Sequence, residues 1–191
     1  MCENDEIIIY MAADTRADRE QRLAACLEDY VKRAGLVFPG PVEVFRNPSR
    51  KPRTNFDEIQ FSVSHSGDVW ACGVSGRPLG VDVELHRESC MAERIARRFF
   101  HPEEYRYLEQ LGFSTEAFFS LWTAKESYLK YLGRGLRVPL DSFCVRLDEN
   151  GASLQAPGAS SALRLHEYTH DGCRICLCTK SPRPPLQLYQ P

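Results

Sequence analysis

Residues 61–84 read FSVSHSGDVWACGVSGRPLGVDVE, and this stretch decides the fold. Its apolar runs are separated by Ser66-Gly67-Asp68 and Gly76-Arg77-Pro78, and both combinations are typical of tight turns. Short apolar runs between turns are the pattern of successive strands. The sequence therefore predicts a meander of short strands from Phe61 to Val83.

Helices are expected on both sides of this meander. The apolar residues of 16–33 recur at steps of three and four, which is the period of an amphipathic helix. The longest helix candidate covers 115–132 and stops at Gly133, whereas 47–55 and 150–162 are expected to be loops. Further elements are predicted as a strand over 7–10, helices over 90–100 and 102–111, and extended segments over 42–45, 142–147, 163–168 and 173–179.

One short sequence pattern occurs twice in the chain. Ser64-His65-Ser66-Gly67 precedes an apolar strand, and Thr169-His170-Asp171-Gly172 precedes another in the same way. We therefore expect an α+β fold of two similar halves, followed by a Pro-rich tail. The predicted division is an N-terminal half over 1–85, a C-terminal half over 86–180 and the tail over 181–191. A functional cleft is expected between the halves, where ligand sites often occur.

Composition excludes several classes of protein. The 191 residues are 43% apolar and 26% charged, with a formal net charge of −2, which argues against a nucleic-acid binder that relies on bulk basic charge. No apolar run approaches the roughly 20 residues of a membrane span. The first residues are acidic where a signal peptide would be basic, so we expect a cytoplasmic protein with no membrane or nucleic-acid partner.

Eight cysteines are present, and we expect them to be reduced thiols. Cys173, Cys176 and Cys178, with His166 and His170 upstream, leave a zinc site as an alternative. Packing as small apolar residues is favoured, because Cys176 and Cys178 share one face of a strand and lack the usual structural-zinc spacing.

Three groups of residues carry candidate chemistry. Asp82 and Glu84 point to the same face of a strand, because alternate residues share a face, while valines occupy the other face. Trp122, Glu126 and Lys130 lie along one stripe of a helix. The third group combines the basic loop 50–53 with the hydroxyl-rich turn 62–67, a composition suited to anions. Taken singly, each has a plainer interpretation: a solvated sheet edge, a surface ion pair and a solvated loop.

Together the three groups favour one site. Asp82, Glu84 and Glu126, here called the acidic trio, supply three hard oxygen ligands, the type that suits Mg²⁺ with bound phosphates. Lys130, one helical turn from Glu126, would neutralise charge on a departing phosphate. His65 and Lys51 would hold other phosphates.

These motifs, in this order, resemble those of the 4′-phosphopantetheinyl transferases of the larger, surfactin-synthetase-activating type. The resemblance covers roughly residues 45–180. It is carried by Arg-Lys-Pro at 50–52, Phe-Ser-Val-Ser-His-Ser at 61–66, Gly-Val-Asp-Val-Glu at 80–84 and Trp-Thr-Ala-Lys-Glu-Ser-Tyr-Leu-Lys at 122–130.

The resemblance implies a monomer of two pseudo-twofold-related α+β halves. Each half would be a small, mostly antiparallel sheet packed with a long helix, with coenzyme A bound between the halves. The family transfers 4′-phosphopantetheine from coenzyme A to a serine of an acyl or peptidyl carrier protein and releases adenosine 3′,5′-bisphosphate.

The resemblance also implies roles at single positions. The acidic trio would coordinate Mg²⁺, with Mn²⁺ as an alternative. Glu126 and Lys130 would be catalytic, the first helping to deprotonate the carrier serine and the second stabilising the leaving bisphosphate. Residues that would contact coenzyme A are Arg22, Arg50, Lys51, Pro52, Ser64, His65 and Lys130.

The sequence departs from the family pattern in two ways. Ser62 stands where the family usually has Asn, and a helix that offers lysines to the 3′-phosphate is not recognised, which leaves Arg22 as the matching cation. We therefore expect weaker selectivity for coenzyme A over its 3′-dephospho form. Two other functions remain open: another Mg²⁺-dependent transferase that cleaves a pyrophosphate, and a non-catalytic module that binds carrier proteins.

Overall fold

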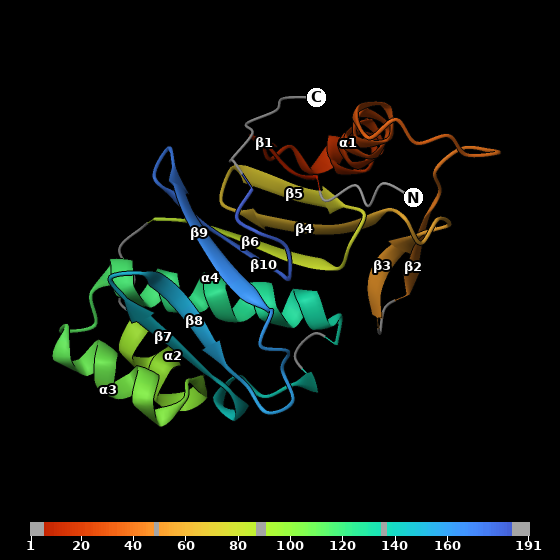
Figure 1. Ribbon diagram of the computed structural model, residues 1–191. Coiled ribbons are helices and arrows are strands. Elements are labelled where there is room, and N and C mark those ends of the chain that lie inside the picture. The colour runs from red at the N-terminus through yellow and green to blue at the C-terminus, as the bar shows by residue number, and fades with distance from the viewer. Residues whose placement is uncertain (1–5, 48–49, 87–90, 135–136, 185–191) are drawn as a thin grey trace.

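The computed structural model describes residues 6–47, 50–86, 91–134 and 137–184. Two three-stranded antiparallel sheets form its centre (Figure 1). The first sheet has the order β1 (Ile7–Ala13), β5 (Val69–Ser75), β4 (Gln60–Ser66). The second has the order β6 (Leu79–Leu85), β10 (Cys173–Thr179), β9 (Arg164–His170). The predicted α+β class with small antiparallel sheets is confirmed.

The two sheets pack against each other through an apolar core. Ile7 and Ile9 of the first sheet share this core with Val81 and Val83 of the second. The approach is close at Gly73, because a Cβ there would lie 2.5 Å from Val81 Cγ2. The prediction that the valines of β6 face opposite to its carboxylates is confirmed.

Helix α1 (Arg19–Arg33) covers the outer face of the first sheet. It follows a short 3-10 turn, η1 (Arg16–Asp18), and buries one apolar stripe against Tyr10 and Trp70. Tyr10 also donates its hydroxyl to Asp29 Oδ2 at 2.9 Å. The helix predicted over 16–33 is therefore present, with its first turn wound more tightly.

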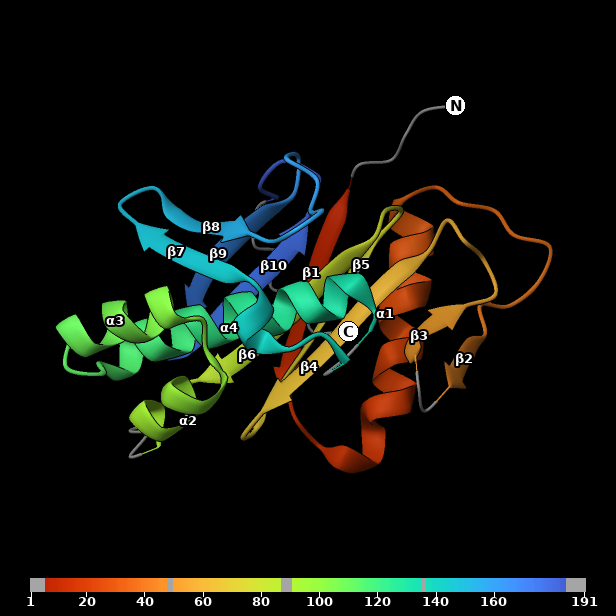
Figure 2. The same cartoon turned by 90° about the horizontal axis from the view of Figure 1, so that it is seen from below.

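Helix α4 (Thr115–Leu132) covers the outer face of the second sheet (Figure 2). Ser114 caps its N-terminus by accepting a hydrogen bond from the Ala117 N–H, and Gly133 ends it with a left-handed φ of 65°. Cys176 and Cys178 pack beneath α4 in its apolar core, as predicted for small apolar residues. Among the described residues, no helix is both long and apolar enough to cross a membrane.

Smaller elements surround α4. The helices are α2 (Ala92–Phe99) and α3 (Pro102–Gln110), and η3 (Leu140–Ser142) leads into the hairpin of β7 (Cys144–Asp148) and β8 (Gly151–Gln155). The expected loop over 150–162 is wrong at β8, whose small residues pair with β7. Cys90, at the start of a predicted helix, lies outside the described residues.

The loop expected over 47–55 is wrong at residues 50–54. These form β3 (Arg50–Thr54), which pairs with β2 (Val44–Asn47) in a two-stranded antiparallel sheet. Its register shifts between Phe45 and Asn47, so Lys51 and Pro52 together face one residue of β2. Pro52 is tolerated because a bulge needs no ladder hydrogen bond from it.

The order of elements occurs twice along the chain. A strand, a helix and two hairpins appear as β1, α1, β2–β3 and β4–β5, and again as β6, α4, β7–β8 and β9–β10, with α2 and α3 inserted. A twofold relation between halves stays a prediction, as does their division at residue 85. Strand β6 lies before that division but pairs with β10.

The predicted Pro-rich tail is described only in its first residues. Residues 181–184 lie against β9, where the Tyr168 hydroxyl donates to the Pro184 carbonyl oxygen at 2.7 Å. The rest of the tail, 185–191, lies outside the described residues.

Candidate functional site

The edge strands β4 and β6 lie side by side where the two sheets meet (Figure 1). Every second residue of β4 from Ser62 to Ser66 is a serine. Ser62 Oγ accepts the Val81 N–H at 3.0 Å, and Ser64 Oγ donates to Asp82 Oδ1 at 2.7 Å. Ser66 Oγ donates to Glu84 Oε2 at 2.5 Å. Ser62 thus satisfies one backbone N–H on the edge of β6, and Ser64 and Ser66 orient its two carboxylates.

Helix α4 approaches the same carboxylates from the other side. Lys130 Nζ lies 2.7 Å from Asp82 Oδ1, and Trp122 Nε1 donates to Glu84 Oε1 at 3.2 Å. The two contacts are eight residues apart on α4, so Glu126 lies between them on the same stripe. Asp82 is almost fully buried, whereas Lys130 keeps a quarter of its side chain exposed.

Glu126 is half-buried between the two contacts. Burial raises the pKa of its carboxyl group above the usual value, and the negative charges of Asp82 and Glu84 raise it further. The ammonium of Lys130 acts in the opposite direction. The acidic trio and Lys130 therefore interact electrostatically, which brings residues of β6 and α4 into one group.

The donor chemistry of this group fits a hard cation. Asp82 Oδ2 is buried and has no hydrogen-bond partner, so one carboxylate oxygen is available to a ligand. In the described part of the chain, no three His, Cys, Asp or Glu side chains are arranged to hold a metal ion. The hydroxyls of β4, the indole of Trp122 and the ammonium of Lys130 instead occupy oxygens of Asp82 and Glu84.

Lys51 binds a backbone carbonyl oxygen and not a carboxylate of the acidic trio. Its Nζ donates to the Leu79 carbonyl oxygen at 2.5 Å. The Lys51 side chain also lies beneath the end of α4, because a Cβ built on Gly133 would be 3.2 Å from the Lys51 Cβ. Burial lowers its pKa to about 8, and nearby Lys130 contributes in the same direction. Pro52 is half-buried in the bulge of β3, and the side chain of Arg50 lies outside the described residues.

A second group of predicted residues lies on the α1 side of β4. His65 is exposed and pairs across the ladder with Trp70. Arg22 places its guanidinium carbon 5.6 Å from the Trp70 ring centroid and donates through Nη2 to Thr15 Oγ1 at 3.0 Å. Its Nη1 is buried without a hydrogen-bond partner. The neighbouring residues Ser64 and His65 therefore face different groups.

Two contributors to these groups had no predicted role: Ser66 binds Glu84, and Thr15 binds Arg22. Trp122 was predicted on the stripe with Glu126 and Lys130, and the structure adds its hydrogen bond to Glu84. The serine at every second position of 62–66 was the signal for Ser66. Thr15 had no comparable signal, because its partner is set by how η1 leads into α1.

The model of one protein family matches residues 78–178, more than half of the chain, and that family is described as the 4′-phosphopantetheinyl transferase superfamily. The chain belongs to this superfamily. The matched range contains β6, α4 and all but the last residue of β10, and so includes the acidic trio and Lys130. The resemblance drawn from the motifs is thereby confirmed.

Individual transferases of the superfamily are also similar to this chain. The 4′-phosphopantetheinyl transferase Sfp of Bacillus subtilis (strain 168) is 36% identical over 129 residues, which are 65% of this chain and 57% of Sfp. The transferase gsp of Aneurinibacillus migulanus is 34% identical over 148 residues, which are 75% of this chain and 61% of gsp. HetI of Nostoc sp. is 34% identical over 136 residues, 68% of this chain and 57% of HetI. The Sfp-like type is supported, although the chain spans less than two thirds of each of these relatives.

Proposed function

We propose that the chain transfers 4′-phosphopantetheine from coenzyme A to a serine of an acyl or peptidyl carrier protein and releases adenosine 3′,5′-bisphosphate. The observation that carries this proposal is the contact of Lys130 on α4 with Asp82 on β6, to which Ser64 of β4 also binds. Three elements thus gather a cation, a carboxylate and a hydroxyl where a pyrophosphate would react.

The proposed roles follow from charge. Transfer of a phosphoryl-type group depends mainly on positioning and charge neutralisation. The Oγ–phosphorus bond forms as the carrier serine attacks the β-phosphorus of coenzyme A, and the bond from that phosphorus to the bridging oxygen breaks. Lys130 stabilises the negative charge on the departing bisphosphate. The raised pKa of Glu126 makes it a better acceptor for the serine proton than an ordinary carboxylate.

We propose that Asp82, Glu84 and Glu126 hold Mg²⁺, or Mn²⁺, beside the pyrophosphate. Bound there, the ion would neutralise charge on the phosphate oxygens. The unpartnered Oδ2 of Asp82 supports this role. A metal ligand is a weaker base than a free carboxylate, so we assign Glu126 to the metal first and to proton transfer second.

The group around Arg22 and His65 is proposed to bind the 3′-phosphate of coenzyme A. The unpartnered Nη1 of Arg22 supports this role, because a guanidinium matches phosphate geometry. Ser64, Lys51, Pro52 and Arg50 are proposed to contact the rest of coenzyme A. Lys51 must first release the Leu79 carbonyl oxygen.

The proposal extends to the oligomeric state and the cellular location of the protein. We propose a monomer that acts in the cytoplasm. The thiols of Cys26, Cys72, Cys144, Cys173, Cys176 and Cys178 are free and buried, which suits a reducing compartment.

The test is the mass of an apo carrier protein after incubation with this chain, coenzyme A and Mg²⁺. A gain of one phosphopantetheine group is expected for at least one acyl or peptidyl carrier. Asp82→Ala is expected to abolish the gain while the protein stays folded by circular dichroism, whereas Asp148→Ala at the exposed end of β7 is the matched control. Transfer by Asp82→Ala at the rate of the unaltered chain would remove Asp82 from the site.

A further inference from the structure

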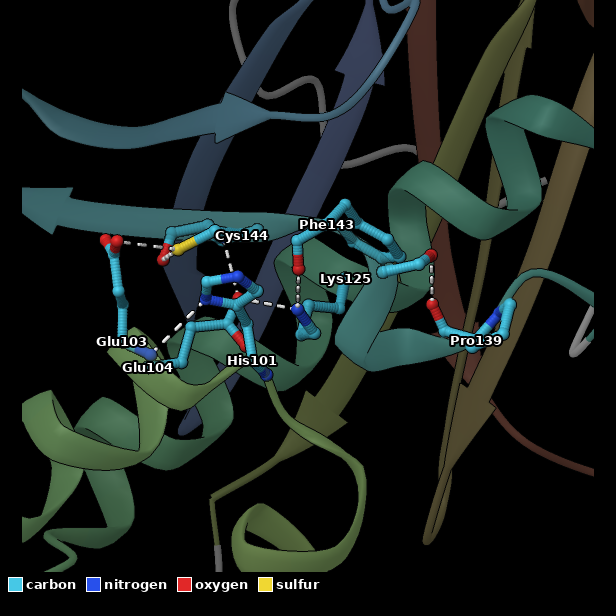
Figure 3. A network of polar contacts seen from close by, with 9 residues as sticks. His101, Glu103, Glu104, Lys125, Pro139, Phe143 and Cys144 are labelled. Carbon is cyan, nitrogen blue, oxygen red and sulfur yellow. Dashed lines mark hydrogen bonds and ion pairs between the residues drawn. The ribbon is translucent and has the colours of Figure 1, made fainter.

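Lys125, the residue before Glu126, points away from the acidic trio into the protein interior. Its side chain has no exposed surface. Its Nζ lies 2.5 Å from Glu104 Oε1 and 2.9 Å from the Phe143 carbonyl oxygen (Figure 3). The proposed reaction uses neither Lys125 nor Glu104. A buried charge is costly unless it is paired and hydrogen-bonded, so the presence of both charges needs a physical reason.

Glu104 forms hydrogen bonds with two other elements near α4. Its Oε1 accepts the Val145 N–H of β7 at 2.6 Å, and its Oε2 accepts the His101 N–H at the start of α3 at 2.9 Å. Lys125 adds α4 to this network (Figure 3). Fully satisfied polar networks specify one arrangement of a core, because hydrogen bonds are directional and apolar contacts are not. The pair therefore links α4 to α3 and β7 through directional contacts.

A chain of contacts leads from the buried pair to β6. Lys125 Nζ lies 5.5 Å from the ring centroid of Phe100, whose ring stacks on Trp122 at a centroid distance of 6.3 Å. Trp122 in turn donates to Glu84. Glu126 lies about 100° around the helix from Lys125, so a rotation of α4 would also displace Glu126 from β6.

We propose that the buried Glu104–Lys125 pair is a positioning device that sets the rotation of α4 and thereby places Trp122, Glu126 and Lys130 against β6. Lys125 and Glu104 are positioning residues and touch no substrate. Only the kinetic part of this inference rests on the proposed transferase function.

The first test uses ¹⁹F NMR of the full chain labelled with 5-fluorotryptophan. The chain has two tryptophans, and Trp70 in the α1 core serves as the internal reference. Lys125→Met and Glu104→Gln are expected to shift the Trp122 resonance and to leave that of Trp70 unchanged. The matched control is Glu103→Gln, because Glu103 is adjacent to Glu104 but pairs with Arg146 at the surface, at 2.9 Å.

The second test is kinetic. Lys125→Met and Glu104→Gln are expected to lower kcat about 100-fold, the scale of a misplacement by one ångström, with a smaller change in KM for coenzyme A. A purely structural role would lower the thermal midpoint and leave kcat per folded molecule as it was. Glu103→Gln is expected to keep the kcat of the unaltered chain.

Each outcome decides the inference. A folded Lys125→Met or Glu104→Gln protein with an unshifted Trp122 resonance overturns it. Should Lys125→Met fail to fold, the isosteric Glu104→Gln gives the same decision. Should the unaltered chain transfer nothing, the proposed function fails, and the ¹⁹F comparison alone decides whether the pair positions α4.

Discussion

Gly80 in β6 lies directly beneath the backbone of Ser127 in α4. A Cβ placed on Gly80 would be 2.0 Å from the Ser127 carbonyl oxygen and 2.4 Å from the Tyr131 nitrogen. The helix therefore rests on the strand at a point where only a hydrogen fits. Because Asp82 follows Gly80 along β6 and Lys130 follows Ser127 along α4, this contact sets the spacing between the two charged groups.

Gly80→Ala is expected to lower the free energy of unfolding by about 3 kcal/mol, since the methyl group must push α4 away from β6. Urea unfolding followed by circular dichroism measures the change. Gly40→Ala is the control, because a Cβ there meets no atom within 4 Å. Equal unfolding midpoints for Gly80→Ala and the unaltered chain would contradict the close contact.

Lys130→Ala is expected to lower kcat about 100-fold, the scale of removing one group that stabilises transition-state charge. KM for coenzyme A should change less, because Lys130 is proposed to act mainly on the departing phosphate. Steady-state kinetics with a carrier protein measures both values. Lys180→Ala, at an exposed position, is the control. A raised KM with kcat preserved would make Lys130 a binding residue only.

Glu126→Gln is expected to stabilise the protein at neutral pH. Burial raises the pKa of Glu126 in the folded state, so folding disfavours the charged form, and this cost appears as the pH rises above the usual carboxyl range. Below that range Glu126 is protonated in both states, and the variant should match the unaltered chain. Thermal midpoints measured from acidic to neutral pH test this. A variant that is less stable at neutral pH would contradict the prediction.

Arg22→Ala is expected to lower kcat/KM for coenzyme A about tenfold, the scale of one hydrogen bond to a charged group. The same substitution should leave kcat/KM for 3′-dephospho-coenzyme A unchanged, because that substrate lacks the phosphate proposed to bind Arg22. Parallel kinetics with both substrates measure the difference. Arg33→Ala, at the other end of α1, is the control. Equal losses with both substrates would assign Arg22 a structural role.

Much of the fold could be predicted from local pattern. The apolar periodicity of 115–132 and the stop at Gly133 gave α4, and the turns of 66–68 and 76–78 gave three strands. The hairpin around Pro52 was missed, because proline normally argues against a strand and the bulge that tolerates it cannot be recognised from local sequence. Strand β8 was missed because its Gly, Ala and Ser residues look like a loop until β7 pairs with them.

Part of the candidate site could also be predicted from the sequence, and part could not. Alternation along β6 was enough to place Asp82 and Glu84 on one face, and helical spacing was enough to place Glu126 with Lys130. Which strand would lie beside β6 could not be predicted. Strand β6 follows β5 after a tight turn, yet it pairs with β10 and meets β4 through serine hydroxyls.

The sequence by itself determined α4, the strands β4, β5 and β6, and the spacing of motifs that places this chain among the phosphopantetheinyl transferases, since these depend on neighbours along the chain. Only the tertiary structure decided the different surroundings of Lys125 and Glu126. These adjacent residues lie about 100° apart on α4, so packing buries one against Glu104 and turns the other toward β6. Contacts between segments that are distant in the sequence therefore determine the surroundings of each residue.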